Sequence, residues 1–261
     1  MIFNLLCLLF LNVVPGPDFT LDQSNDRYQA DFRESPAIDK LGRINYFIPD
    51  HQAFTELLRT HVNQKGEVDY AGFKKDMDKL QRYLDHLNEQ TPTAEWTRSE
   101  QLAYWINVYN AFTIKLIIDH YPVGSITEID QGKPWDTRWI HLGDATYSLN
   151  QIENEIIRPD FNEPRIHFAL NCAAKSCPPL ANEAFTSANL ESLLEKRTGA
   201  FINNSSYNKI AASSASISKI FDWYGSDFGN LISFLNKYST TEIKPSAKVS
   251  FNEYDWGLNK Q

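Results

Sequence analysis

Residues Thr97–His120, TRSEQLAYWINVYNAFTIKLIIDH, form the most strongly predicted helix of the chain. Thr97 and Glu100 make a capping box, in which the threonine oxygen and the glutamate carboxylate satisfy free amides of the first turn. Apolar residues cover a wide face of the helix, and Pro122 follows its last turn and stops it. A helix with so wide an apolar face has to be covered by other elements, so we expect it to be central.

Two asparagines, Asn107 and Asn110, lie three positions apart in this helix and are neighbours on its surface. Asparagine is a mediocre helix former, and a buried amide needs hydrogen-bond partners. The pair therefore consists either of two solvated amides or of polar groups aimed at a strand or a site.

Outside this helix, the pattern predicts both strands and helices. Trp139–Leu142 and Ala145–Tyr147 flank a Gly-Asp pair, which is typical of a hairpin. Ser148 begins a second capping box and a helix that carries Glu153 and ends before Pro159. Because strands and helices do not alternate strictly, we predict a single α+β domain. In it, the central long helix packs on a small mixed or antiparallel sheet.

The stretch Arg165–Leu180, RIHFALNCAAKSCPPL, carries the candidate chemistry. We predict a strand over Ile166–Leu170 that leads into a turn. His167, Cys172 and Cys177 follow one another at intervals of five positions. Side chains alternate between the faces of a strand, so His167 and Cys172 would meet only if the chain turned sharply. Otherwise each would work with partners from other elements.

One interpretation of this stretch is a thiol-dependent hydrolase or acyl transferase. Cys172 would be the nucleophile, His167 its base and Glu153 the group that orients the base. The small residues after Cys172 would let backbone amides act as oxyanion donors. The residues that would bind substrate or shape the site are Asn107, Asn110, Trp105, Asn171 and Cys177.

Three other interpretations fit the same residues. Cys172 and Cys177 could form a disulfide if the loop curls back. Together with His167 and Glu153 they are chemically suitable zinc ligands, but no second cysteine pair exists, so we predict no metal. Alternatively, the cluster is structural and the chain is a non-catalytic binding or interaction module. An open cleft with His or Glu beside Cys172 would favour the enzyme.

The composition limits the possible partners. The 261 residues carry a net charge of −8, and no run of Lys and Arg is present, which argues against nucleic-acid binding. The sequence contains no glycine-rich phosphate loop or nucleophile elbow, and we predict no cofactor. The expected partner is an unidentified ligand or protein.

The N-terminus predicts export. Its apolar run, MIFNLLCLLFLNVV, is too short to span a membrane but suits a secretory signal, although no Lys or Arg precedes it. We interpret residues 1–16 as a signal peptide, 17–45 as a flexible lead-in and 46–261 as the domain. The mature protein would then be secreted or periplasmic, without a membrane span.

Five motifs resemble one family in the same order. YWINVYNA at Tyr104–Ala111 resembles the WINxYNA signature of the domain of unknown function 547 family, and HYPVGSI, SLNQIENEIIR, RIHFALNCAAKSCPPL and YDWGLN are similar to later motifs. The resemblance covers roughly 54–259 and implies a bacterial member, but the biochemical role of the family is not established. It marks Trp105, Asn107, Asn110, Glu153, His167, Cys172 and Pro178. The family often has His where this chain has Asn154, and some relatives have Ser in place of Cys177.

Overall fold

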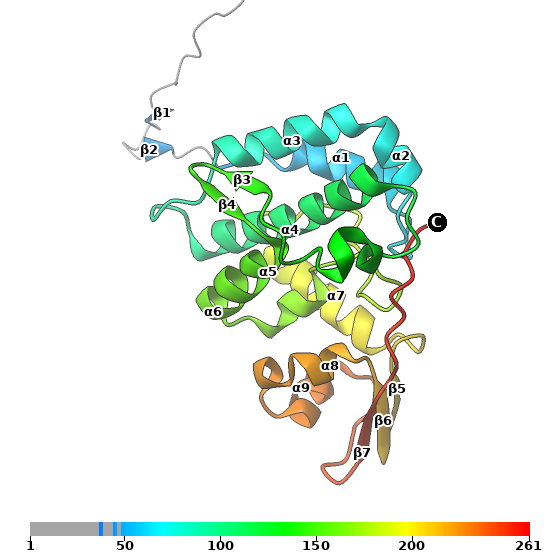
Figure 1. Ribbon diagram of the computed structural model, residues 1–261. Helices are drawn as coiled ribbons and strands as arrows, with labels where there is room; N and C mark the ends of the chain where they lie inside the picture. Colours follow the sequence, from blue (N-terminus) through cyan, green and yellow to red (C-terminus); the bar gives the residue numbers. More distant parts are fainter. Residues whose placement is uncertain (1–36, 39–43, 46–47) are drawn as a thin grey trace, which may run out of the picture. The chain divides into compact units, whose positions relative to one another are not determined.

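The computed structural model describes residues 37–38, 44–45 and 48–261 of the chain (Figure 1). The chain divides into two units, Met1–Asn45 and Tyr46–Gln261. In the first unit, β1 (Ala37–Ile38) and β2 (Ile44–Asn45) pair in the antiparallel sense. The predicted signal peptide and most of the lead-in lie outside the described residues. All elements discussed below belong to the second unit.

The long helix α4 (Arg98–His120) is confirmed, and so is its capping box at Thr97 and Glu100. Figure 1 shows α1, α2 and α3 on one side of α4. On the other side lie α5 (Leu149–Gln151), α6 (Arg158–Phe161) and α7 (Leu190–Ile202). The helices on the first side are α1 (Gln52–His61), α2 (Tyr70–Lys75) and α3 (Met77–Glu89). Because both sides are covered, α4 buries nearly its whole middle, from Leu102 to Ile114.

The predicted hairpin is also confirmed. After the 3-10 segment η1 (Ile126–Gly132), β3 (Ile140–Leu142) and β4 (Ala145–Tyr147) form an antiparallel pair. Aromatic rings join the hairpin to the long helix. Phe112 contacts Trp139 edge to face at 5.5 Å between ring centroids, and Trp105 contacts Tyr147 at 5.7 Å. Helix α4 thus packs on a small antiparallel sheet.

The second capping box begins a helix of irregular pitch. It runs through α5 (Leu149–Gln151), the π-helical segment η2 (Ile152–Ile157) and α6 (Arg158–Phe161). The Arg158 amide donates a hydrogen bond to the Glu153 carbonyl five residues earlier. This spacing is that of a π-helix, which is wider than an α-helix. The prediction that this helix ends before Pro159 is wrong. Pro159 falls at the start of α6, directly after the widened turn of η2, and the helix continues through it to Phe161.

The strand predicted over Ile166–Leu170 is wrong. The chain forms the 3-10 segment η3 (Pro164–Phe168) instead. Pro164 fixes the backbone angle at its start, and the Glu163 side chain accepts the Arg165 amide as a cap. Ile166 and Phe168 are buried like the residues beside them, because η3 is enclosed by other elements and not laid across a sheet. Side-chain alternation along a strand therefore does not separate His167 from Cys172.

A mixed sheet and four helical segments complete the unit around a second core. Strands β5 and β6 pair antiparallel, and β6 pairs with β7 in the parallel sense. The side chains of Phe168, Phe201 and Phe221 pack together between this sheet and the helices. The elements are α7 (Leu190–Ile202), β5 (Lys209–Ala211), β6 (Ser214–Ile217), α8 (Ile220–Trp223), η4 (Gly225–Phe228), α9 (Leu231–Tyr238) and β7 (Lys248–Phe251).

The predicted fold class, a single α+β domain, is confirmed by this arrangement. Among the described residues, every helix is too short or too polar to cross a membrane.

Candidate functional site

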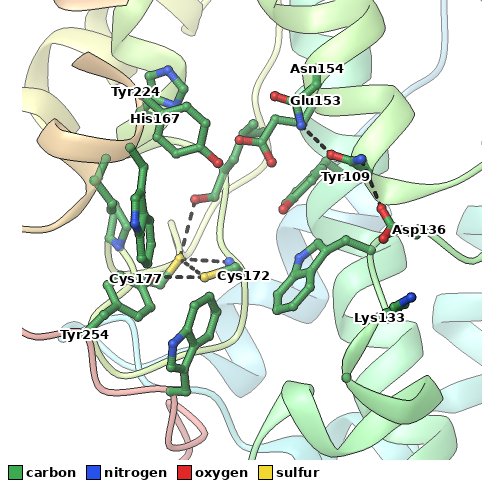
Figure 2. Close-up of a pocket in the computed structure, with 18 residues that line it drawn as sticks. Tyr109, Lys133, Asp136, Glu153, Asn154, His167, Cys172, Cys177, Tyr224 and Tyr254 are labelled. Carbon is green, nitrogen blue, oxygen red and sulfur yellow. Dashed lines mark hydrogen bonds between the residues drawn. The ribbon is translucent and has the colours of Figure 1, made fainter.

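A pocket of about 340 Å³ brings four of the predicted residues together (Figure 2). Glu153 comes from η2, His167 from η3, and Cys172 and Cys177 from the loop that follows η3. The volume lies in the range of small-molecule sites. Aromatic side chains form much of the remaining wall: Tyr109, Trp135, Trp223, Tyr224, Tyr254 and Trp256.

Asn110 and Asn171 hold the loop that carries the two thiols. The Asn110 amide donates to the Ala169 carbonyl, and its oxygen accepts the Asn171 amide, both at 2.9 Å. The Asn171 side chain then donates to the Pro178 carbonyl at 2.8 Å and accepts the Ala173 amide at 3.0 Å. These bonds replace the pairing that a strand would have given the backbone. The loop is therefore fixed by side chains and not by a sheet.

Asn107 and Trp105 do not line the pocket but contact other parts of the fold around α4. Asn107 clasps one backbone position, donating to the Phe185 carbonyl at 2.7 Å and accepting its amide at 2.9 Å. Asn107 and Asn110 are 1% and 3% exposed, so the interpretation as solvated amides is wrong. Trp105 packs edge to face against Tyr104 and Tyr147.

The residue after Cys172 adopts a left-handed backbone conformation. Ala173 has φ 62°, although it carries a Cβ and is fully buried. Asn259 donates its amide to the Ala173 carbonyl at 3.0 Å, and Ala174 forms an antiparallel bridge with Leu258. Such strain persists only where the surroundings impose it, and it is concentrated at functional sites. The C-terminal segment thus holds Cys172 on a strained turn.

Cys172 and Cys177 are free thiols in direct contact. Their Sγ atoms lie 2.8 Å apart, and the Cys172 amide donates to the Cys177 sulfur at 2.8 Å. The Tyr254 hydroxyl lies 3.1 Å from the Cys172 sulfur. Hydrogen bonds from Cys177, Tyr254 and the Ala174 amide lower the pKa of Cys172, whereas burial raises the pKa of Cys177. Cys172 is accordingly the more acidic thiol of the pair.

His167 forms a hydrogen bond with Asp227, a residue that we did not predict from the sequence. Its Nε2 lies 2.8 Å from the Asp227 carboxylate, which also receives two hydrogen bonds of 2.7 Å from Arg158. These bonds hold the pKa of Asp227 well below its usual range. The His167 ring stacks on Tyr224 at 4.0 Å between centroids. Within the described part of the chain, no hydrogen bond joins His167 to Cys172.

Glu153 faces the same pocket from the π-helical segment. Glu153 is 8% exposed, and its carboxylate lies near the Tyr224 hydroxyl. Burial, together with the charge and hydrogen bond of Glu153, raises the pKa of Tyr224. Widened helical turns often occur at functional sites. Figure 2 shows Glu153, Tyr224 and the two cysteines directed at one cavity.

The C-terminal segment supplies pocket residues that were not predicted. Tyr254 and Trp256 contact each other at 4.6 Å between ring centroids, and Trp256 also contacts Trp135 and Trp223. Gly257 forms an antiparallel bridge with Ser125, the residue that precedes η1. The YDWGLN motif was a signal for this role, because so aromatic a tail has to dock somewhere.

The structure bears differently on the zinc site and on the disulfide, the two alternatives for the cysteines. Among residues 37–38, 44–45 and 48–261, no three His, Cys, Asp or Glu side chains are grouped closely enough to hold a metal ion, although the four candidate zinc ligands line one pocket. The disulfide stays a prediction, since both thiols are free but adjacent.

The central segment of the chain matches a known family model. Residues 93–202 match the family model described as Protein of unknown function, DUF547. The resemblance is confirmed for this segment, which contains Asn107, Asn110, Glu153, His167 and both thiols of the pocket. No curated protein and no solved structure matches the chain.

Proposed function

We propose that this chain, which carries the DUF547 segment, is a thiol-dependent hydrolase or acyl transferase with Cys172 as its nucleophile. The observation that supports this most is the setting of the Cys172 thiol. It has a lowered pKa, sits on a strained turn and shares a pocket with the buried Glu153 carboxylate. A lowered pKa raises the fraction of thiolate, which is the form that acts as a nucleophile.

The proposed reaction begins with transfer of the Cys172 proton to the Glu153 carboxylate. The thiolate attacks a substrate carbonyl carbon, a C–S bond forms, and the carbonyl electron pair moves to oxygen. When that pair returns, the bond to the leaving group breaks, and Glu153 gives the leaving group its proton. Water or an acceptor then attacks the thioester and loses a proton to Glu153. Collapse releases the acyl product and the Cys172 thiolate, which Glu153 reprotonates.

We assign His167 a positioning role and not that of the base. Its partner is Asp227, and its ring stacks on Tyr224, whose hydroxyl contacts Glu153. His167 therefore sets the position of Tyr224 and, through it, of the carboxylate. Tyr254 completes the site by donating to the developing Cys172 thiolate.

The test is to trap the acyl-enzyme. Wild-type protein is incubated with p-nitrophenyl acetate, and peptide mass spectrometry looks for an acetyl thioester on Cys172. We expect the adduct in wild type and in Cys177→Ala, slower formation in Glu153→Gln, and none in Cys172→Ala. An activity-based thiol probe that labels Cys172→Ala as strongly as wild type would refute the proposal.

A non-catalytic binding module is the second candidate. It is favoured by the aromatic mouth of the pocket, where Trp223 is 46% exposed and contacts Tyr254 and Trp256. In this case a ligand would bind Cys172→Ala and wild type with equal affinity, and no thioester would form on either.

We also propose that the protein is exported by a bacterial host. The support is the apolar run of residues 1–16, which lies outside the described structure. N-terminal sequencing of protein from the periplasmic or culture fraction should begin near residue 17. Recovery of the intact N-terminus from the cytoplasm alone would contradict export.

A further inference from the structure

A second pocket, of about 680 Å³, lies against the loop that carries the two thiols. Cys177 and Pro178 belong to the walls of both pockets, so the loop separates them. The other walls come from the turn at Gly66, the C-terminal half of α7, Tyr207 and Lys260. The reaction proposed above makes no use of this second pocket.

The charge of this pocket is opposite to that of the whole chain. Four cationic side chains line it, while Glu67 is its single carboxylate. The chain as a whole has a net charge of −8, so this concentration of positive charge is local. Three of the four are exposed lysines, and the fourth is a half-buried arginine: Lys65, Lys175, Lys260 and Arg197.

Arg197 lacks the counter-ion that comparable arginines have. Arg158 pairs with Asp227 at 2.7 Å, and Arg165 pairs with Glu163 at 2.6 Å. Arg197 forms no ion pair with any residue of the described structure. Burial lowers its pKa to about 10, and the opposing effects of Tyr207 and Glu183 are too weak to offset the loss of hydration. A desolvated guanidinium without a carboxylate partner is costly to the protein.

We propose that this pocket binds a compact polyanion carrying phosphate or carboxylate groups, with Arg197 as its principal ligand. A guanidinium presents a planar fork of donors that matches both groups in a bidentate manner. Ser206 and Tyr207 add hydroxyl groups to the same wall. The lysines at the rim attract the anion by their charge. This binding is independent of chemistry at Cys172.

The experiment is isothermal titration calorimetry of the full chain with inorganic pyrophosphate and, separately, with citrate at constant ionic strength. We expect saturable binding of at least one probe, and the tighter probe identifies the preferred anionic group. Arg197→Gln should weaken binding by about tenfold or more. Arg197→Lys should retain part of the affinity for the anion, and Lys65→Ala should weaken binding less than Arg197→Gln does. The matched control is Lys237→Ala, an exposed lysine outside both pockets, which should bind like wild type.

A stability measurement separates ligand binding from a structural role. Without anion, Arg197→Gln should melt at or above the wild-type temperature, because it removes an uncompensated charge. With saturating probe, only wild type should gain melting temperature. A clearly lower melting temperature for Arg197→Gln without anion would overturn the proposal. Absence of saturable binding of either probe, or equal binding by this variant, would also overturn it.

Discussion

The Nε2 atom of His167 lies 2.8 Å from the carboxylate of Asp227, a residue sixty positions later in the chain. Arg158 donates two hydrogen bonds to the same carboxylate. The three side chains form a network behind Tyr224, on which both His167 and Arg158 pack. The imidazole is thereby committed to holding one wall of the pocket. This bond engages Nε2, which is why we assign the ring a positioning role and not the role of base expected from the sequence.

Asp227→Asn should destabilise the protein by about 1–3 kcal/mol at pH 7, because His167 and Arg158 lose a charged acceptor. The folded-state pKa of Asp227 is lowered, so its contribution is fully present above its unfolded pKa of about 4 and is lost as the pH falls further. The difference between variant and wild type in urea unfolding should therefore narrow below about pH 4. Asp222→Asn, at a surface pair with Lys219, is the control and should cost less than about 1 kcal/mol. A difference that stays constant down to pH 2 would contradict the assignment.

Iodoacetamide should modify Cys172 faster than Cys177 at neutral pH, because hydrogen bonds lower the pKa of the first thiol and burial raises that of the second. Tyr254→Phe removes one of those bonds and should move the pH midpoint of Cys172 labelling upward by roughly one unit. Tyr147→Phe, a tyrosine outside the pocket, should leave the midpoint unchanged. Mass spectrometry of labelled peptides measures both rates. Faster labelling of Cys177 would show that the roles are reversed.

Asn110→Ala should reduce the free energy of unfolding by about 2–4 kcal/mol, since the Ala169 carbonyl and the Asn171 amide lose buried partners. Asn107→Ala should cost a similar amount at Phe185. Only the first variant loosens the thiol loop, so only it should alter the labelling rate of Cys172. Urea unfolding and iodoacetamide labelling test the pair together. Equal labelling in the two variants would show that Asn110 does not control the loop.

Gly66→Ala should be destabilising by about 2 kcal/mol or more, because an added Cβ would lie 2.7 Å from the Pro179 Cα. Gly66 also has φ 77°, where a side chain is strained. Gly199→Ala is the matched variant, since nothing lies within 4 Å of its added Cβ. This second change should stabilise α7 by about 0.5–1 kcal/mol. Thermal unfolding of both variants measures this difference in stability. An unchanged melting temperature for Gly66→Ala would mean that the loop at Pro179 moves to accept the added Cβ.

The elements with strong local signals could be predicted from the sequence. The capping boxes at Thr97 and Ser148 begin the helices, and the Gly-Asp pair between Leu142 and Ala145 turns the hairpin. These features depend on residues within a few positions of one another. The apolar run at Ile166–Leu170 has a weaker local determinant, the Glu163-Pro164 pair that precedes it. It is buried from several sides, so its composition suits a strand, but Pro164 and Glu163 direct it into a 3-10 turn.

The candidate site was predicted in part. Glu153, His167, Cys172 and Cys177 do line one pocket. Their pairing could not be predicted, because Asp227, Tyr224 and Tyr254 reach the site only through the tertiary fold. No spacing rule connects residues so far apart in the chain. The asparagines of α4 were recognised as unusual, but which backbone each one holds depends on the loop that folds against it.

The C-terminal segment Tyr254–Lys260 fixes the order in which the site can be assembled during synthesis. Its backbone bridges to Val68, Ser125 and Ala174, and its Tyr254 hydroxyl contacts the Cys172 sulfur. A ribosome adds this segment about eighty residues after Cys172. Until it has emerged, the turn at Ala173 lacks its clamp and Cys172 lacks one of the groups that lower its pKa. The Cys172 thiol of the nascent chain is therefore less acidic, and the full lowering of its pKa arises only when this segment docks.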